Sequence, residues 1–330
     1  MSEVQPVVSG ALRAVIVGAS GIGKHHAKWL NALGAQVVAI VGSSPDSAAA
    51  TAQKLQDEFG FHPRAYDSIT TMLSEEDPDL VHICTPPEKH FEHVMAVAPH
   101  RCHVLCEKPL TWDEAKSAVQ LLDEARQMVK ATSQPGRQAA VNLQYTLAPR
   151  AYHALCLKLG QGAEPPRQFF MHMDSKRERN VYDIIWRELS PHCLSVMRAF
   201  CGAGIVDYET ARLTLAERQC RAQFVYARQD GGECECEIVV GTETQGPLTR
   251  RFGINGLVVD YEGRNDAKGV FRTYLKSDGV EAESDDFMYL SMRELLLAVT
   301  GQIPEPPATL AEGLRNEEMQ LEILARGKRV

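Results

Sequence analysis

The first half of the chain alternates short runs of β-branched and other apolar residues with segments of helical periodicity. Apolar runs with the length and composition of buried strands lie at 12–17, 36–41, 80–84, 103–106 and 139–142. Segments rich in helix formers lie between them, at about 23–33, 46–59, 90–98 and 111–129. Parallel strands need a crossover connection, which is usually a helix. This half therefore predicts an α/β fold with a doubly wound parallel sheet that helices cover on both faces.

After residue 149 the pattern changes. A helix at about 150–159 and a strand at 167–174 precede a series of strand-like runs that Gly, Asp and Asn turns separate. These runs lie at 208–215, 221–228, 234–241, 256–261 and 269–275, and helices return at about 285–300 and 308–326. The pattern predicts an α+β domain with an open, largely antiparallel sheet that has one helix-covered face. We therefore expect two domains, 1–142 and 143–330, and the final helix could pack back on the first of them.

Charge and composition narrow the class of partner. A net charge of -8 argues against a nucleic-acid binder, which needs a basic surface against the phosphates. No apolar run approaches the ~18 residues of a membrane span, and the first residues lack the basic start of a signal peptide. The scattered cysteines, without a paired CxxC spacing, favour reduced thiols in a cytoplasmic protein and no metal site. We therefore expect a small-molecule partner, and neither nucleic acid nor a membrane.

A glycine-rich turn follows the first predicted strand and opens a helix. Its sequence, Gly18-Ala-Ser20-Gly21-Ile22-Gly23, matches G-x-G-x-x-G at the first and third glycines, with Ser20 at the middle position. The first glycine permits the tight turn, the middle residue lets the backbone approach a pyrophosphate, and the third lets the helix pack on the strand. A helix N-terminus at this place can bind phosphate. The turn predicts that the first domain is a Rossmann domain that binds a dinucleotide.

The end of the second predicted strand bears on the choice between NAD and NADP. An NAD site usually carries an acid there to hold the ribose 2′-hydroxyl, and Gly42 stands at that position instead. Ser43 and Ser44 are available as hydrogen-bond donors, so the sequence modestly favours NADP over NAD. Asp46 argues the other way, although its place after Pro45 is typical of an acid in the first turn of a helix.

Three motifs of the first half occur in the order and spacing of one enzyme family. They are Gly18–His26, Cys84–His90 with the sequence CTPPEKH, and Cys106–Pro109 with the sequence CEKP. Together they resemble the glucose-fructose oxidoreductase, inositol dehydrogenase and MocA-type (Gfo/Idh/MocA) family, and Trp186–His192 and Thr309–Arg315 add weaker likeness in the second half. The resemblance implies an NAD(P)-binding Rossmann domain, a C-terminal domain for substrate binding and oligomerisation, and a homodimer or homotetramer formed through the open sheet.

The resemblance also implies where the chemistry takes place. Lys108 matches the lysine of the E-K-P motif, which in the family lies near the nicotinamide and the reacting oxygen, usually before a cis proline. Glu188 and His192 match a later D-x-x-x-H pair, with glutamate in place of aspartate, and a spacing of four puts both side chains on one helix face. We expect His192 to be the principal acid/base and Lys108 its partner, because imidazole titrates near neutrality and burial can make an amine share a proton.

Four further residues are candidates for the cofactor side of the site. Thr85 and Pro86, after the strand at 80–84, are expected to edge the nicotinamide pocket. Glu107 either contacts the cofactor or fixes the turn before Lys108. His90 either caps its helix or touches the cofactor.

The substrate side is less defined by the sequence. Tyr145 could face the substrate, and Arg177 and Arg187 could hold a carboxylate or a phosphate, since guanidinium groups bind both. The expected activity is hydride transfer between NADP or NAD and a hydroxyl or keto carbon of a sugar, polyol or related small molecule. A reductase of imines or other double bonds and a non-catalytic, cofactor-binding regulator are the alternatives, and the presence of both Lys108 and His192 favours the enzyme.

Overall fold

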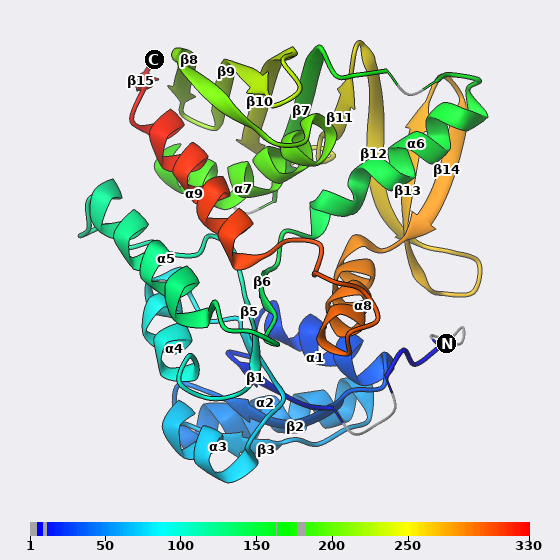
Figure 1. Cartoon of the computed structure of the whole chain (residues 1–330). Helices are drawn as coiled ribbons and strands as arrows, with labels where there is room; N and C mark the ends of the chain where they lie inside the picture. The colour runs from blue at the N-terminus through cyan, green and yellow to red at the C-terminus, as the bar shows by residue number, and fades with distance from the viewer. Residues whose placement is uncertain (1–4, 9–11, 163, 177–181) are drawn as a thin grey trace. The chain divides into compact units, whose positions relative to one another are not determined.

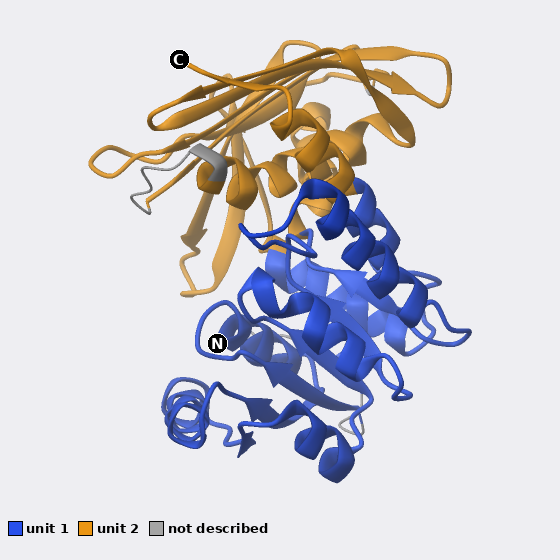
Figure 2. Ribbon diagram, turned by 90° about the vertical axis from the view of Figure 1, so that its left-hand side faces the viewer, with its two compact units in different colours: residues 1–143, 288–315 blue, residues 144–287, 316–330 orange. Residues whose placement is uncertain are grey.

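Two compact units make up the chain. The computed structural model describes residues 5–8, 12–162, 164–176 and 182–330. Unit 1 comprises 1–143 and 288–315, and unit 2 comprises 144–287 and 316–330 (Figure 2). This division differs from the expected domains mainly in one segment, 288–315, which joins unit 1 although it follows the second sheet in the sequence.

Unit 1 is built on a six-stranded parallel sheet of order β3-β2-β1-β4-β5-β6 (Figure 1). Its strands are β1 (Arg13–Val17), β2 (Gln36–Val41), β3 (Arg64–Tyr66), β4 (Leu80–Ile83), β5 (His103–Cys106) and β6 (Ala139–Val141). Its helices are α1 (Gly23–Ala32), α2 (Pro45–Phe59), α3 (Ile69–Glu76), the short η1 (Pro87–Lys89), α4 (His90–Val97), α5 (Ala118–Thr132) and nearly all of α8 (Phe287–Val299). The strand order reverses between β1 and β4, where ligands bind in doubly wound sheets. The predicted α/β fold of the first half is confirmed.

Both faces of this sheet are buried. Along β1, Ala14 and Ile16 belong to the cluster that α1 and α8 complete, whereas Val15 and Val17 belong to a second cluster with α3, α4 and α5. A strand that is buried on both faces needs apolar side chains at every position. The continuous run RAVIV therefore specifies a central strand rather than an edge strand.

The helix expected at 111–129 begins later than its composition suggested. α5 starts at Ala118, because the Ser117 side chain accepts a hydrogen bond from the Gln120 N–H while the Gln120 side chain accepts one from the Ser117 N–H. This reciprocal capping box fixes the first turn of the helix. The short β3 and the helix α3 are elements that the pattern did not predict.

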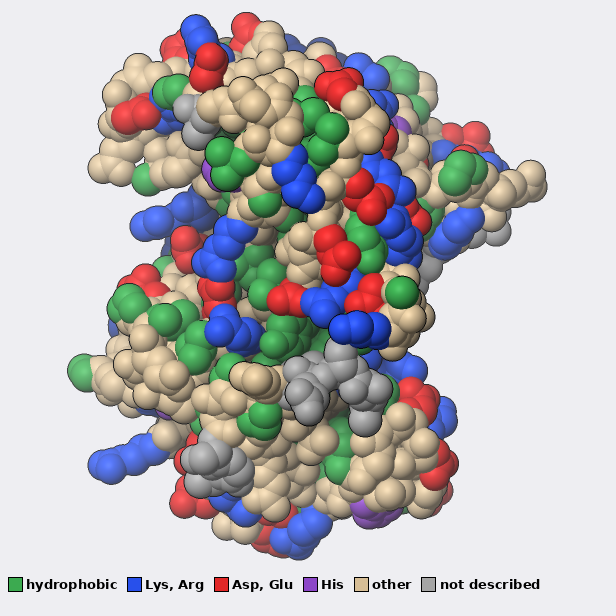
Figure 3. All heavy atoms as spheres, turned by 90° about the vertical axis from the view of Figure 1, so that its right-hand side faces the viewer, with side chains coloured by type: hydrophobic (Ala, Val, Ile, Leu, Met, Phe, Trp, Pro, Cys, Tyr) green, Lys and Arg blue, Asp and Glu red, His purple; other side chains and the backbone are tan. Residues whose placement is uncertain are grey.

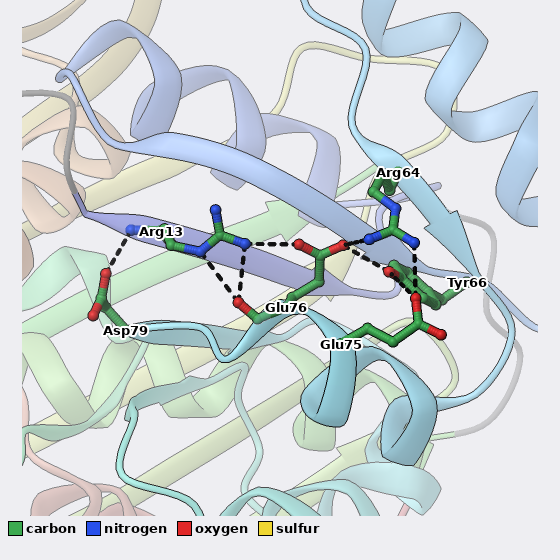
Figure 4. Close-up of polar contacts among 6 residues, drawn as sticks. All are labelled: Arg13, Arg64, Tyr66, Glu75, Glu76 and Asp79. Carbon is green, nitrogen blue, oxygen red and sulfur yellow. Dashed lines mark hydrogen bonds and ion pairs between the residues drawn. The ribbon is translucent and has the colours of Figure 1, made fainter.

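A buried carboxylate connects the end of α3 to the sheet of unit 1 (Figure 4). The side chain of Glu76 is 4% exposed and accepts hydrogen bonds from Arg13 at 2.8 Å, from Arg64 at 2.7 Å and from the Tyr66 hydroxyl at 2.6 Å. Burial and the hydrogen bonds to Glu76 and Glu75 raise the pKa of Tyr66, so its hydroxyl stays a donor. Two cations and one hydroxyl thus share a single acid, which ties β1 and β3 to α3.

Unit 2 contains a nine-stranded mixed sheet of order β14-β13-β12-β11-β7-β10-β9-β8-β15 (Figure 1). Its strands are β7 (Gln168–Ser175), β8 (Gly204–Ala216), β9 (Gln219–Arg228), β10 (Glu233–Thr242), β11 (Arg250–Ile254), β12 (Leu257–Asn265), β13 (Phe271–Ser277), β14 (Val280–Asp285) and β15 (Gly327–Arg329). The β7–β10 and β8–β15 pairs are parallel, and the other pairs are antiparallel. The predicted, largely antiparallel sheet is confirmed.

Helices cover one face of this second sheet. They are α6 (Ala148–Lys158), which follows the short η2 (Gln144–Leu147), and α7 (Tyr182–Cys201). Along β7, Phe169 is buried and its ring lies 6.3 Å from that of Phe200 on α7, whereas Phe170 and His172 are only half-buried. The alternation means that every second side chain of β7 lies on the uncovered face. α9 (Leu310–Leu324) begins in unit 1 and ends in unit 2.

Basic and acidic side chains are interspersed with apolar ones on the face drawn in Figure 3. On the outer strands of unit 2, Arg264 contacts Glu262 and Glu281, and Lys276 contacts the same two acids. Such exposed pairs contribute little to stability, because water and salt screen the charges. Among the described residues, none of the helices combines the length and the apolar character needed to cross a membrane.

Candidate cofactor and substrate sites

A cavity of 780 Å³ lies at the carboxyl edge of the unit 1 sheet. The turn after β1, the loops after β2 and β4, and the first turns of α2, α3 and α4 form its walls. Of the cofactor candidates, it brings together Gly18, Ser20, Ser43, Thr85 and Pro86. The others lie outside its lining, namely Gly21, Ile22, Gly23, Ser44, His90, Glu107 and Lys108.

The glycine turn is closed by close backbone contacts. Gly18 has a φ of +89°, and a Cβ there would lie 2.9 Å from the Cys84 carbonyl group, so neither the conformation nor the space admits a side chain. At Gly23 a Cβ would lie 2.4 Å from the Gly18 oxygen. Gly21, in contrast, has no atom within 4 Å of such a Cβ. Gly18 and Gly23 are thus required by the turn, whereas Gly21 is not.

The N-terminus of α1 offers backbone donors at this turn. Within the described residues no side chain caps the helix, whose N-cap residue is the 42% exposed Ile22. The first N–H groups of a helix have no partner inside the helix and attract anions. The tight turn and the uncapped helix therefore fit the pyrophosphate of a dinucleotide.

The loop after β2 is packed closely against α2. A Cβ on Gly42 would lie 2.8 Å from the Ala48 nitrogen, which explains why no acid can stand at this position. Ser43 lines the cavity, whereas Ser44 caps α2 by accepting a hydrogen bond from the Ser47 N–H at 3.2 Å. Ser47 itself lines the cavity, and so does Asp67 from the loop after β3.

The loop after β4 is held by two histidines. The Thr85 hydroxyl lies 3.1 Å from His93 Nδ1, and both residues line the cavity. His90 is fully buried, with its ring between the Thr85 carbonyl at 2.8 Å and the Pro109 carbonyl at 2.9 Å. Burial lowers the pKa of His90, so the ring is neutral near pH 7 and donates to one carbonyl at a time. His90 therefore connects this loop to the segment after β5.

Lys108 follows β5 directly and is partly exposed, and its peptide bond to Pro109 is cis. The preceding Glu107 is buried, and one of its oxygens accepts hydrogen bonds from the Asn142 amide at 2.6 Å and from His26 at 2.9 Å. Its other oxygen accepts the Lys108 N–H at 3.2 Å. Of the two roles expected for Glu107, these contacts agree with fixing the turn.

In unit 2, His192 on α7 lies in an aromatic cluster. Its ring is 4.9 Å from the ring of Tyr145, which comes from η2 and is 7% exposed. Tyr145 also contacts Tyr261 at 5.8 Å and Phe287 at 5.9 Å, and the Arg250 guanidinium lies 5.9 Å from the Tyr261 ring. Burial, reinforced by neighbouring Tyr261, raises the pKa of Tyr145 well above its ordinary value, so this phenol stays protonated.

Glu188 and His192 both lie on α7 and are partly exposed, four residues apart. Glu188 lies 3.9 Å from Arg187, whose side chain is 12% exposed. The helix is anchored to α9, since the Trp186 indole donates to the Gln320 carbonyl at 3.0 Å. Arg177 lies outside the described residues. In the described part of the chain, no three histidine, cysteine or acidic side chains gather so that they could hold a metal ion.

Several residues of these sites were not identified from the sequence. Ser47, Thr51, Asp67, Ser68, Lys89 and His93 line the cavity, and Tyr261, Arg250 and Phe287 surround Tyr145. Ser47 and Thr51 had a detectable signal, because they lie four residues apart on the helix after the second strand. The residues around Tyr145 come from three separate elements, and no local pattern relates them.

The sequence of the first half matches a known family model. The model of an oxidoreductase family with an NAD-binding Rossmann fold matches residues 12–133, which contain the glycine turn and the E-K-P motif. Residues 12–133 are thus similar to the Gfo/Idh/MocA oxidoreductase family. The match agrees with the six-stranded parallel sheet of unit 1, and NAD binding is part of the description of that family.

Curated relatives match the same region. The chain is 33% identical to D-glucoside 3-dehydrogenase of Escherichia coli over 130 residues, which are 38% of this chain and 34% of that protein. It is 30% identical to inositol 2-dehydrogenase of Acidothermus cellulolyticus over 102 residues, which are 30% of this chain and 28% of that protein. The matches thus span about a third of the length of these curated relatives.

Solved structures share the fold of the whole chain. UDP-N-acetylglucosamine 3-dehydrogenase GnnA from Acidithiobacillus ferrooxidans has a TM-score of 0.72 at 20% identity and covers 96% of this chain and 97% of its own. A scyllo-inositol dehydrogenase from Lactobacillus casei has a TM-score of 0.69 at 13% identity, with 96% of each chain covered. The likeness shows that unit 2, like unit 1, has a fold found in these solved structures.

Proposed function

We propose that this chain is an NAD(P)-dependent dehydrogenase or reductase that transfers hydride between a nicotinamide and a hydroxyl or keto carbon of a sugar, polyol or related small molecule. The observation that carries the proposal is the cavity of 780 Å³ that the Gly18 turn closes at one end and the Thr85–Pro86 loop borders. The backbone donors at the N-terminus of α1, beside this cavity, match the pyrophosphate of a dinucleotide. The dehydrogenases among the relatives support the choice of reaction.

Two side chains would handle the substrate's proton and charge, and two more would support them. A bound nicotinamide supplies the hydride acceptor or donor. His192 takes the proton of the substrate hydroxyl on an imidazole nitrogen during oxidation and returns it during reduction. The Lys108 ammonium stabilises the negative charge that develops on the same oxygen. Tyr145 restricts the orientation of the His192 ring, and Glu188 supplies a carboxylate on the same face of α7.

For the cofactor we propose a modest preference for NADP. Gly42 leaves no acid at the tip of β2, and Ser43 and Ser47 place two hydroxyl groups in the cavity wall beside it. An acid at the tip would hold the ribose 2′-hydroxyl of NAD and repel the 2′-phosphate of NADP. Asp67 in the cavity wall works against this preference. Fluorescence titrations with NADPH and NADH test it, and clearly tighter binding of NADH would overturn it.

We also propose that the protein works as a homodimer or homotetramer in the cytoplasm. The face of the nine-stranded sheet opposite α6 and α7 carries a cavity of 530 Å³ lined in part by Phe170, Val225 and Val258, apolar groups that a second copy could cover. All nine cysteines are free and buried, which agrees with a reducing compartment.

The activity is tested by following the absorbance of the nicotinamide while a panel of substrates is added. The panel contains aldoses, glycosides, inositols and sugar acids, each offered with NADP and NAD, and the matching keto compounds offered with the reduced cofactors. We expect at least one pair to give turnover. No change with any pair, combined with tight cofactor binding, would refute the enzyme and favour the cofactor-binding regulator.

A further inference from the structure

A chain of polar side chains crosses the buried interior of unit 1 beside Lys108. His82 Nδ1 lies 2.9 Å from His26 Nδ1, and His26 Nε2 lies 2.9 Å from a Glu107 oxygen. The same oxygen accepts a hydrogen bond from the Asn142 side-chain amide at 2.6 Å, and the Ser291 hydroxyl donates to Asn142 Oδ1 at 3.3 Å. Both histidines are 0% exposed, and the five residues come from five different elements or loops.

Glu107, the acid in this network of polar side chains, is ionised. Burial alone would raise the pKa of Glu107, but the hydrogen bond and charge of His26, with Asn142 and Lys108, outweigh it and lower the pKa to about 2. A buried carboxylate is stable only when donors surround it. His26 and Asn142 supply donors to one oxygen, and the Lys108 N–H supplies a donor to the other.

Hydrogen-bond donors fix the orientation of the two rings. Because Glu107 can only accept, His26 must carry a proton on Nε2. The single proton between the two Nδ1 atoms then lies either on His82, with a neutral His26, or on His26, with an imidazolium facing the carboxylate. Burial and then the charge of His26 lower the pKa of His82 well below its ordinary value, so His82 is neutral in both cases. Either arrangement keeps the His26 Nε2 donor directed at Glu107.

The buried pair of histidines lowers the stability of the core of unit 1. His82 Nε2 has no hydrogen-bond partner among the described residues, and a buried polar atom without one costs ~1–3 kcal/mol. The neighbouring positions of β4 hold Val81 and Ile83, which pack without such a cost. Apolar side chains of similar volume can replace buried polar networks without loss of stability. A requirement other than folding therefore favours the histidines here.

We propose that His26 is a positioning residue for Lys108, acting through Glu107, and that His82 fixes the orientation of the His26 ring. His26 and Asn142 hold one oxygen of Glu107, so that the other oxygen accepts the backbone N–H of Lys108 and the carboxylate interacts electrostatically with the Lys108 ammonium. The proposal rests on the role of Lys108 in the proposed function. It adds a pair of residues that lie outside the cavity lining and touch neither the proposed cofactor nor the proposed substrate.

The test compares the chemical reactivity of single lysines, so it needs no substrate. The full-length protein is acetylated with limiting acetic anhydride, and peptide mass spectrometry gives the rate at Lys108 relative to the rates at Lys89 and Lys116. In His26→Leu we expect the acetylation rate of Lys108, relative to the two reference lysines, to rise about fivefold. A change of this size corresponds to the loss of one net hydrogen bond. In His26→Gln, whose amide can still donate to Glu107, the rate should return close to the wild-type value.

His103→Leu is the matched control. His103 stands at the other end of β5 and accepts a hydrogen bond from the Gln138 N–H at 2.9 Å. Its replacement should lower the melting temperature without changing the rate at Lys108. An unchanged rate in His26→Leu, or an equal rise in His103→Leu, would overturn the proposal. If His26→Leu does not fold, Glu107→Gln takes its place. An unchanged acetylation rate of Lys108 in Glu107→Gln would likewise overturn the proposal. The acetylation rates do not depend on turnover of any substrate. Failure of the proposed function can therefore be distinguished from failure of the proposed role of His26.

Discussion

At the scale of single residues, the glycine turn separates positions that look alike in the sequence. Gly18 and Gly21 both belong to the motif, but only Gly18 combines a positive φ with backbone atoms at 2.9 Å from a would-be Cβ. The motif could therefore be located from the sequence. Whether each of its positions tolerates a side chain depends instead on how closely Cys84, which follows β4, approaches the turn. That approach results from strand register, which the local sequence does not contain.

We expect Gly18→Ala to lose most of its affinity for NADP and NAD, and to lose stability as well. A non-glycine residue at this φ costs ~1–3 kcal/mol, before the clash with the Cys84–Thr85 backbone is counted. Gly21→Ala is the matched control and should bind both cofactors within about twofold of the wild type, since a methyl group there meets no other atom. Fluorescence titration and thermal unfolding measure both effects. Equal losses in the two variants would contradict the structural account of the turn.

Glu107 gives stability a specific dependence on pH. Its folded pKa of about 2 lies below the ordinary value of 4.5, so its ionised form stabilises the fold above about pH 4.5, and the contribution disappears as the pH falls toward 2. Glu107→Gln should therefore be less stable than the wild type near neutral pH, by at most on the order of 3 kcal/mol. Urea unfolding at a series of pH values should show this gap narrowing below about pH 4.5. A gap that stays constant down to acid pH would contradict the ionised, hydrogen-bonded state.

The partners of Glu107 show the limit of sequence reasoning at this scale. Lys108 and His192 could be named because each belongs to a short motif. His26 lies at the end of the glycine motif, but its pairing with His82 could not be predicted, because the two residues are 56 positions apart and meet only where α1 packs beside β4. A lone histidine on the buried face of a helix gives no sign of its partner. The aromatic neighbours of Tyr145 were missed for the same reason.

At the scale of elements, a buried acid holds the end of α3 to the sheet. Glu76→Gln should lower the free energy of unfolding by roughly 1–3 kcal/mol, because a buried carboxylate that accepts hydrogen bonds from Arg13, Arg64 and Tyr66 loses its charge. Glu75→Gln, one residue away, is the control. Its side chain is 46% exposed, and the change should cost less than ~1 kcal/mol. Urea unfolding measures the loss of stability in the two variants. Similar losses would mean that the network around Glu76 in Figure 4 contributes little to stability.

Most elements could be predicted because their signal is local. Apolar runs located β1, β2, β4 and β5 to within one residue, since a strand buried on both faces needs apolar side chains throughout. β3, with three residues, is too short to show a period, and its helix α3 was missed with it. The late start of α5 was in the sequence as the capping pair Ser117 and Gln120, but helix-forming residues before it obscured the signal.

At the scale of the whole molecule, the open face of the unit 2 sheet bears on assembly. We expect the protein to elute with a mass about two or four times 36.5 kDa in light scattering coupled to size-exclusion chromatography. Val225→Arg, on the open face, should reduce this mass to that of one chain, because it buries an unpaired charge in the interface. Leu157→Arg is the control, since Leu157 is 77% exposed on α6 and lies elsewhere on unit 2. A wild-type protein that elutes as a monomer would contradict the proposed assembly.

The change of pattern after residue 149 predicted two parts, and the final helix was expected to be able to pack on the first, but the return of α8 to unit 1 could not be predicted. The apolar residues of α8 show only that the helix is buried on one side. They do not show which sheet it covers, because both sheets need a helical cover. The contacts of Met292 and Leu296 with the cluster around Ile16 decide the matter.

The central claim is that nicotinamide chemistry is carried out with His192 and Lys108 handling the substrate's proton and charge. The most direct test is the turnover of the best substrate of the panel, followed by nicotinamide absorbance, in the wild type, His192→Ala and Lys108→Ala. Cofactor affinity is measured alongside, and Lys116→Ala serves as the control for loss of a lysine. The account predicts that both site variants bind cofactor normally and lose at least about a hundredfold in kcat, as removal of a general acid or base does. Near-wild-type turnover in His192→Ala, or no turnover by the wild type with any substrate, would contradict it.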